Sequence, residues 1–351
     1  MNKTKKEKTR YYSLDILRLL SMLMVVVLHY CTFGYQITKV GTPGYNSYPL
    51  WIVYAFCYGA VNLYVLIRGF FLSESEFKWK KVFKLWAQVF FYSIIIGGIF
   101  YFNNLYEFQS IKDYLCVFLP FISKTYWFFT IYTVMYVLSP YLNKLTHTLS
   151  QKEFKKLLIV AGVIIIVLNE FIPGTHLIDN TYGYGIIWFL YLFLLASYIR
   201  MYDLPKIKNI YYLLIHIVGS LGAFLSRFII LKYLSETDLF KNQINMFYNY
   251  NTIFIFMASV GLFMFFKNIK LKEIFPKTIE TVSKATFGVY LIHENFLVRS
   301  VLYTKVLKVM SFAKKPLLIK GSAMIGSVLA VFIVCIIIDL MRERLFRRVG
   351  L

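Results

Sequence analysis

Residues 12–32, YSLDILRLLSMLMVVVLHYCT, form an apolar stretch of membrane-spanning length that nevertheless carries three ionisable side chains. Asp15 and Arg18 lie near its start, and His29 lies near its end. A charged side chain inside a bilayer costs at least ~2.5–3.5 kcal/mol, so such residues usually face the interior of a helix bundle or a watery cavity. We therefore interpret this face of the stretch as the lining of a functional interior.

The three ionisable groups have a defined geometry if the stretch is helical. At about 100° per residue, the steps from Arg18 to His29 make about three turns, which places both side chains on nearly the same face, roughly 16 Å apart. Asp15 lies one turn before Arg18, close enough to pair with it. The alternative is an interfacial ion pair of Asp15 with Arg18, and a His29 that simply marks the outer membrane boundary.

The composition places the rest of the chain in a membrane as well. Of 351 residues, 59% are hydrophobic and only 16% are charged, whereas soluble domains are about one quarter charged. The net charge is +22, but the basic residues form short clusters between apolar spans, which argues against nucleic-acid binding. The cysteines are scattered without metal-ligand spacing, so we expect free thiols and no metal site.

Apolar windows of about 20 residues predict an all-α, polytopic integral membrane protein with about ten transmembrane helices. The expected spans are 12–33, 50–73, 80–102, 126–146, 154–172, 184–202, 208–231, 248–267, 284–304 and 317–341. We find no internal repeat and no linker to a soluble domain, so residues 1–351 are expected to form a single membrane domain. Its basic N-terminus, 1–11, leads into the first span without a cleavage pattern.

Lysine and arginine set the expected orientation of these spans. They gather in alternate loops, and the positive-inside rule makes those loops and both termini cytoplasmic. An even number of spans agrees with this orientation. The last outer loop runs against the trend, since it contains Lys305, Lys308, Lys314 and Lys315.

Other ionisable residues also fall within the expected spans. In the ninth span, a continuous helix turns His293 and Glu294 about 100° apart, so these two and Arg299 cannot all share one face. Asp339 and Arg342, one turn apart near the end of the last span, are expected to form an ordinary interfacial ion pair.

Two isolated arginines need a partner or water. Arg227 lies within the seventh span, where an arginine requires one or the other. Arg68, at the end of the second span, either pairs with an acidic group in the bundle or extends to the cytoplasmic headgroups, and we favour the second interpretation.

Several of these motifs resemble the membrane-bound acyltransferase family 3, whose members O-acylate sugars of cell-envelope glycans. The resemblance maps the family's essential Arg/Lys-x10-His pair onto Arg18 and His29, which it implies are catalytic. The stretch YLIHEN is similar to the family's Tyr-Leu-x-His element near the end of the chain. Together with Asp15, the residues of this stretch and its continuation are expected to support catalysis: His293, Glu294 and Arg299.

The resemblance extends to the region after the second span. The stretch around Arg68 resembles an aromatic-rich pattern that closes in Ser-Gly-Phe, with arginine in place of the serine. The segment KKVFKLW resembles an Arg-x-x-Arg element, with Lys81 and Lys84 in the arginine positions. Together these resemblances imply a role of Arg68, Lys81 and Lys84 in donor binding. Lysine lacks the bidentate phosphate geometry of arginine, so a pure orientation signal stays open. Trp127, Ser139, Pro140 and Asn143 match a further family stretch and are expected to be structural.

The resemblance implies transfer of an acyl group, most simply acetyl, from cytoplasmic acetyl-CoA to a hydroxyl of an extracytoplasmic polysaccharide or lipid-linked sugar, in a bacterial plasma membrane. Arginine suits the phosphates of coenzyme A, and histidine suits the role of base or transient acyl carrier. Candidates to contact the acceptor are Asn169, Glu170, His176 and Asp179. The alternatives are a polytopic transporter, which usually has repeated halves and broken helices, and a non-catalytic polysaccharide export or assembly partner.

Overall fold

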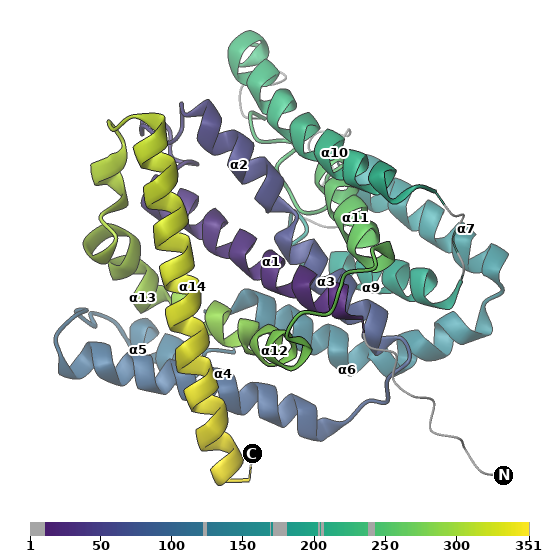
Figure 1. Ribbon diagram of the computed structural model, residues 1–351, viewed down its shortest axis with the longest axis horizontal. Helices are drawn as coiled ribbons and strands as arrows, with labels where there is room; N and C mark the ends of the chain where they lie inside the picture. Colours follow the sequence, from purple (N-terminus) through teal and green to yellow (C-terminus); the bar gives the residue numbers. More distant parts are fainter. Residues whose placement is uncertain are drawn as a thin grey trace.

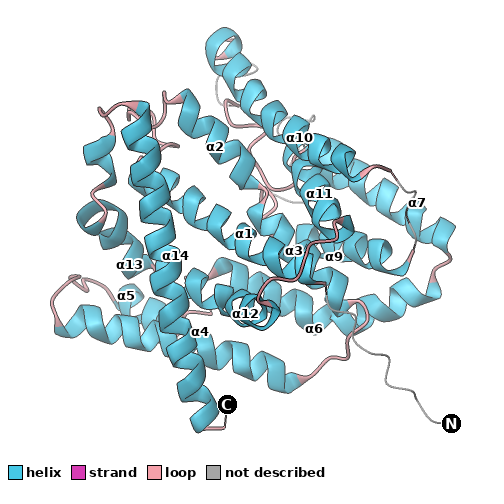
Figure 2. Cartoon of the chain, in the orientation of Figure 1, coloured by secondary structure: helices cyan, strands magenta, loops and turns pink. Residues whose placement is uncertain are grey.

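The computed structural model describes residues 11–121, 125–168, 170, 181–202, 204, 207–237 and 243–350. Within these residues the chain forms helices and loops and contains no strand (Figure 2), which confirms the all-α prediction. Residues 1–10 of the basic N-terminus lie outside the described part. The α-helices are α1 (Tyr12–His29), α2 (Tyr48–Tyr58), α3 (Ala60–Leu72), α4 (Trp79–Phe102), α5 (Ile111–Phe118), α6 (Trp127–Thr148), α7 (Gln151–Gly162), α9 (Ile186–Met201), α10 (Asn209–Ile229), α11 (Ile253–Asn268), α12 (Pro276–His293), α13 (Phe296–Val301) and α14 (Leu317–Arg348).

Short segments of other helical types extend several of these helices. Wider π-helical turns continue the chain directly after α1, α7, α10 and α13: η1 (Tyr30–Gly34), η2 (Val163–Leu168), η3 (Ile230–Leu234) and η4 (Leu302–Val306). A 3₁₀ segment, η5 (Val309–Phe312), precedes α14. Isolated π turns inside α-helices occur frequently at functional sites.

Several helices have the length and composition of membrane spans. Among the described residues, the helices long and apolar enough to cross a membrane are Tyr12–Gly34, Tyr48–Leu72, Trp79–Phe102, Asn209–Leu234 and Leu317–Arg348. The shorter apolar helices Ile186–Met201 and Ile253–Asn268 lie in two further predicted spans. The outward faces are apolar as well, since Ile333, Val334 and Ile337 of α14 are each 53% exposed. These faces suit contact with lipid, and the chain is a multi-pass membrane protein.

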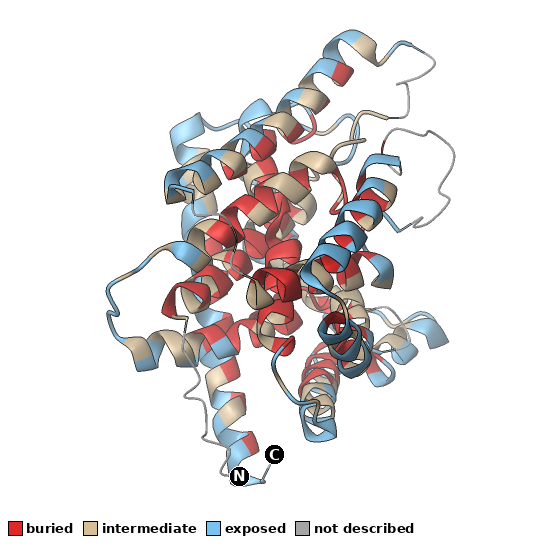
Figure 3. Ribbon diagram, turned by 90° about the vertical axis from the view of Figure 1, so that its right-hand side faces the viewer, coloured by how far each residue is buried: buried red, intermediate tan, exposed pale blue. Residues whose placement is uncertain are grey.

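Helix α1 lies at the centre of the bundle. It packs against α2, α3, α11, α12 and α14 (Figure 1). Leu14, Leu17 and Val26 of this helix have no exposed surface. Among the described residues, the buried ones gather in the middle of the molecule (Figure 3). The stretch that contains the three ionisable groups is therefore enclosed by protein, as the cost of burying charge in lipid requires.

The second predicted span, 50–73, is divided into α2 and α3 at Gly59. A Cβ atom on Gly59 would lie 2.5 Å from the Oγ of Ser259, so α11 can approach this point only because the residue is glycine. One turn further along, the Nδ2 of Asn62 donates to the same Ser259 Oγ at 3.2 Å, and the Nε1 of Trp188 donates to Asn62 Oδ1 at 2.9 Å. These bonds join α3 to α9 and α11.

The prediction of one continuous ninth span, 284–304, was wrong. Helix α12 ends at His293, and Asn295 begins α13 by accepting a hydrogen bond on Oδ1 from the backbone N–H two residues on, at 3.0 Å. The hydroxyl of Tyr126 donates to the carbonyl of Leu291 at 2.9 Å and accepts from Asn295 Nδ2 at 2.8 Å. An asparagine directly before an apolar run is a helix-start signal, and here it produces the break.

The pair of Asp339 and Arg342 is buried, so the prediction of an ordinary interfacial ion pair was also wrong. Their side chains are 1% and 6% exposed. Both oxygens of Asp339 accept from Arg342, and its Oδ1 also accepts from Gln88 Nε2 at 3.0 Å and from the Tyr92 hydroxyl at 2.8 Å. A Cβ on Gly288 would lie 2.2 Å from Asp339 Cγ, so glycine allows α12 to reach this cluster. The cluster joins α4, α12 and α14.

Candidate active site

A cavity of about 300 Å³ lies beside α1 and is enclosed by α3, α6 and α12. Met22, Val25 and His29 of α1 and Thr32 of η1 form one wall, at the three- and four-residue spacing of one helix face. Arg18 lies one turn before Met22 on this stripe, so the predicted common face of Arg18 and His29 exists. It is polar only toward its ends, because Met22 and Val25 occupy the middle. The predicted continuous polar lining of this face was therefore wrong, because its middle is apolar.

The cavity has two chemically different ends. The α2–α3 segment runs antiparallel to α1 and η1. The Tyr64 hydroxyl of α3 donates to the Arg18 carbonyl of α1 at 3.1 Å, while the Tyr54 hydroxyl of α2 lies 3.3 Å from the hydroxyl of Thr32 in η1. Arg68, beyond Tyr64 on α3, therefore lies at the end of the cavity nearer Arg18. His29 lies at the opposite end, about 10 Å from Met22 along the axis of α1.

At the second end, His29 belongs to a cluster that we call the histidine cluster: His29, His293, Glu294 and Arg299. The Nδ1 of His29 lies 2.9 Å from Nε2 of His293 and 3.1 Å from Oε2 of Glu294. The other oxygen of Glu294 accepts from Arg299 Nη1 at 2.7 Å. His293 has no exposed surface, and Glu294 is 5% exposed. All of the supporting residues predicted for the ninth span lie in this cluster.

The break after His293 makes this cluster possible. In a continuous helix, Glu294 and Arg299 would point in different directions from His293, as the helical spacing predicts. Because α12 ends at His293, Glu294 turns toward His29, and Arg299 reaches it from α13. On the other side of the cluster, α1 passes into the π-helical η1 directly after His29. Both histidines are thus the last residues of their α-helices.

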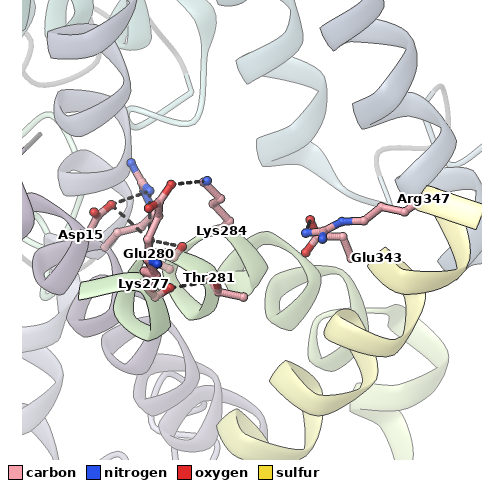
Figure 4. Close-up of polar contacts among 9 residues, drawn as sticks. Asp15, Lys277, Glu280, Thr281, Lys284, Glu343 and Arg347 are labelled. Atoms are coloured by element: carbon pink, nitrogen blue, oxygen red, sulfur yellow. Dashed lines mark hydrogen bonds and ion pairs between the residues drawn. The ribbon is translucent and has the colours of Figure 1, made fainter. Parts of the chain in front are cut away.

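The predicted pairing of Asp15 with Arg18 is present in the structure. The Nη1 of Arg18 lies 3.2 Å from Asp15 Oδ1 and 3.4 Å from Ser283 Oγ of α12, and Ser283 also donates to Asp15 at 3.1 Å. Figure 4 shows Asp15 facing α12 near the Glu280–Lys284 ion pair. Arg18 is only 8% exposed and is not among the cavity-lining side chains, while the Asp15 side chain is 15% exposed. The pair therefore lies between α1 and α12 with its guanidinium buried.

The three predicted donor-binding cations lie in different surroundings. Arg68 lines the cavity, with its guanidinium 5.9 Å from the centre of the Tyr132 ring, so it does not extend to the headgroups as we had favoured. Lys81 and Lys84 are exposed on α4 and are not part of the cavity wall, although Leu85 of the same helix is. The structure therefore brings Arg68 to the cavity and leaves both lysines on the surface.

Arg227 has the partners that its position requires, away from the cavity. It is 2% exposed, and its guanidinium lies 3.7 Å from the centre of the Trp51 ring. Its Nε donates to Asn245 Oδ1 at 3.1 Å, and its Nη2 donates to the Tyr45 carbonyl at 3.3 Å. This arginine joins α10 to α2 and to the loops that contain Tyr45 and Asn245.

The predicted acceptor contacts are only partly within the described residues. Asn169, His176 and Asp179 lie outside them. Glu170 is buried, and its Oε2 accepts a hydrogen bond from the backbone N–H of Ile253 at 3.0 Å, at the first turn of α11. Glu170 is not among the side chains that line the cavity.

The sequence did not assign the aromatic side chains at the His29 end of the cavity to the site, and Trp127 was expected to be structural. Trp127, Tyr184 and Tyr250 line this end, with ring centres 4.6 Å apart for Trp127 and Tyr184 and 4.7 Å apart for Tyr184 and Tyr250. No sequence signal distinguishes Tyr184 and Tyr250 from the other aromatic residues, because the chain contains 29 tyrosines and 34 phenylalanines. Tyr126 and Asn295, which shape the break in the ninth span, were missed as well, although Asn295 carries a helix-start signal.

This arrangement combines a cation, an apolar passage and an imidazole paired with a carboxylate. A histidine beside a carboxylate suits proton abstraction or nucleophilic attack. Arginine suits phosphate or carboxylate groups. In the described part of the chain, no three His, Cys, Asp or Glu side chains are grouped as metal ligands.

The chain was compared with known proteins. The model of an acyltransferase domain, that of acyltransferase family 3, matches residues 11–340. This range includes the histidine cluster, Arg18, Arg68 and Asp339, and it ends before Arg342. Searches of curated proteins and of solved structures find no match.

Proposed function

Because the chain belongs to acyltransferase family 3, we propose that it moves an acyl group, which we take to be acetyl, from cytoplasmic acyl-CoA to an extracytoplasmic hydroxyl. The acceptor is an envelope polysaccharide or a lipid-linked sugar in a bacterial plasma membrane. The observation that carries this proposal is that one cavity has Arg68 at one end and the His29–Glu294 pair at the other.

The donor enters at the Arg68 end on this proposal. The positive-inside pattern assigns that end to the cytoplasm, where acyl-CoA is present. Arg68 then meets an anionic part of the donor, while the exposed Lys81 and Lys84 raise the local concentration of anions by long-range attraction. Arg18, buried one helical turn from the cavity wall, contributes positive potential rather than direct contact.

The acceptor enters at the His29 end. His29 takes the proton of the acceptor hydroxyl as its oxygen attacks the thioester carbonyl, and the coenzyme A thiolate leaves. Glu294, 3.1 Å away, stabilises the positive charge that forms on the imidazole. The rings of Trp127, Tyr184 and Tyr250 provide flat apolar faces for a sugar ring at this end.

The experiment that tests this function measures the O-acetyl content of envelope glycans by proton NMR before and after mild alkali. Cells carry the wild-type chain, the His29→Ala variant or no gene. We expect an alkali-labile acetyl signal with wild type alone, at equal amounts of protein in the membrane. Equal signals in all three strains would contradict the proposal.

A polytopic transporter or export partner is the second candidate, and one observation favours it. Two helices beside the cavity are interrupted, at Gly59 and after His293, and broken helices are typical of transporter binding sites. A transporter moves its substrate without consuming acetyl-CoA. Release of free coenzyme A thiol by the purified protein in the presence of acceptor therefore separates the two functions, because only the acyltransferase releases it.

A further inference from the structure

Two atoms of the histidine cluster can accept a hydrogen bond from Nδ1 of His29, namely Nε2 of His293 and Oε2 of Glu294, and their geometry differs. We infer that His293 holds the proton of neutral His29 on the Nδ1 atom of His29, so that His29 acts on the substrate through its Nε2 atom. Glu294 then stabilises the imidazolium that forms when this Nε2 takes a proton. His293 is thus a positioning residue. The catalytic consequence rests on the proposed function, but the protonation pattern itself can be tested without it.

The side of His293 that faces away from His29 fixes its protonation. Its Nδ1 lies 2.6 Å from the backbone carbonyl oxygen of Val289. A carbonyl oxygen can only accept, so Nδ1 of His293 carries a hydrogen. The ring has no exposed surface, and a neutral ring avoids an additional buried charge. In the neutral ring, Nε2 of His293 therefore has a lone pair and acts as an acceptor.

This acceptor determines the protonation of His29. The Nε2 of His293 lies 2.9 Å from Nδ1 of His29, so Nδ1 of His29 must be the donor in this bond. A neutral imidazole has one hydrogen, and the Nε2 of His29 is then left with the free lone pair. His29 lines the cavity, so the lone pair is available to a substrate there.

Glu294 has a different task in this arrangement. Its Oε2 lies 3.1 Å from the same Nδ1 but makes no hydrogen bond among the described residues, while Oε1 is held by Arg299. Before the reaction, the Nδ1 hydrogen of His29 points to His293. When Nε2 takes a proton, the imidazolium lies beside a carboxylate that is already in place. The two neighbours of His29 thus act on different protonation states.

The direct test is nitrogen-15 NMR of purified wild-type protein labelled at histidine. The chain has five histidines, and the signals that disappear in His29→Ala identify His29. We expect a protonated Nδ1 and an unprotonated Nε2 on His29, and the same pattern on His293. A protonated Nε2 on neutral His29 would overturn the inference. This readout requires no acyl transfer, so a failure of the proposed function would not be mistaken for a failure of the inference.

A pair of variants tests the consequence for catalysis. His293→Gln places an amide oxygen near the lost Nε2 acceptor, whereas His293→Leu retains bulk without an acceptor. We expect His293→Leu to lower kcat by at least about ten-fold with little change in KM, and to lose the single protonation pattern of His29. His293→Gln should recover most of kcat and keep the pattern. If His293→Leu keeps both the pattern and kcat, Glu294 alone orients His29 and the inference is wrong.

Discussion

Two ionic clusters lie beside the same helix, α12, one against Gly288 and one at its end at His293, and they differ in how completely their polar atoms are paired. The Asp339 cluster consists of Asp339, Arg342, Gln88 and Tyr92, and each oxygen of its carboxylate accepts at least one hydrogen bond. In the histidine cluster, Oε2 of Glu294 has no hydrogen-bond partner among the described residues. The first cluster is closed, while the second faces the cavity.

This difference separates structure from chemistry in a bundle with many intramembrane charges. A saturated cluster has no capacity left for a ligand, and it holds the helices together. An unsatisfied carboxylate next to a histidine and a cavity is costly to maintain and is typical of functional sites. Helical spacing alone does not separate the two clusters, whereas their hydrogen bonding does.

The largest expected effect is the loss of the closed cluster. Replacing Asp339 with Ala leaves Arg342 buried without its carboxylate, and removal of one partner of a buried pair typically costs about 3–5 kcal/mol. We expect a marked fall in the thermal unfolding temperature of the protein in detergent. An unchanged unfolding temperature would show that Arg342 finds water or lipid headgroups, and that the cluster does not hold the helices.

Replacing Glu294 with Gln should have the opposite profile. The amide retains the shape but cannot stabilise a positive charge on His29, so we expect acyl transfer to fall by about 10²–10³-fold, a magnitude typical of general base catalysis. The unfolding temperature should change much less than in Asp339→Ala. Initial rates of coenzyme A release and thermal unfolding of the same preparation provide both numbers. A large loss of stability with near-normal rates would assign Glu294 to structure.

The approach of α12 to the closed cluster can be tested at Gly288. A Cβ there would lie 2.2 Å from Asp339 Cγ, and overpacking of this kind typically costs about 1–3 kcal/mol. The matched control is Gly326→Ala on α14, where a Cβ meets nothing within 4 Å. We expect Gly288→Ala to lower the unfolding temperature and Gly326→Ala to leave it unchanged or slightly raised. Equal behaviour of the two variants would contradict the close packing.

The smallest effect is expected at an exposed carboxylate, which serves as a reference for both buried clusters. Glu153 lies before the predicted fifth span, and the Ser150 hydroxyl and backbone N–H donate to it, which lowers the pKa of Glu153. A lowered pKa stabilises the fold above the usual glutamate pKa of about 4.3, and this contribution is lost as the pH falls below it. The unfolding temperatures of wild type and Glu153→Gln should differ slightly at neutral pH and converge in acid. A constant difference would exclude this carboxylate as its source.

Much of the helical architecture follows from the sequence, because apolar windows of membrane length leave little choice. The interruptions do not. The second span is divided at Gly59, where the chain lies against Ser259, a residue 200 positions away, and a hydropathy window contains no information on such a contact. Asn295 was recognisable as a helix start, but its bond to Tyr126 requires the folded chain. Local spacing therefore predicts the helices better than their ends.

The candidate site shows the same division. The Asp15–Arg18 pair could be predicted, since both partners lie on one helix a turn apart. The identical spacing of Asp339 and Arg342 led to a wrong prediction, because spacing does not report burial. The contact of His29 with His293 joins residues 264 positions apart, so the sequence identified both histidines without showing that they meet.

The measurement that tests the central claim most directly is vectorial acyl transfer in proteoliposomes. Labelled acetyl-CoA is added on the side of the Arg68 end, and an envelope glycan acceptor is enclosed on the other side. With wild-type protein we expect label on the glycan, and with His29→Ala at equal protein content we expect none. Label that stays on the donor with wild type, or equal transfer by His29→Ala, would contradict the account.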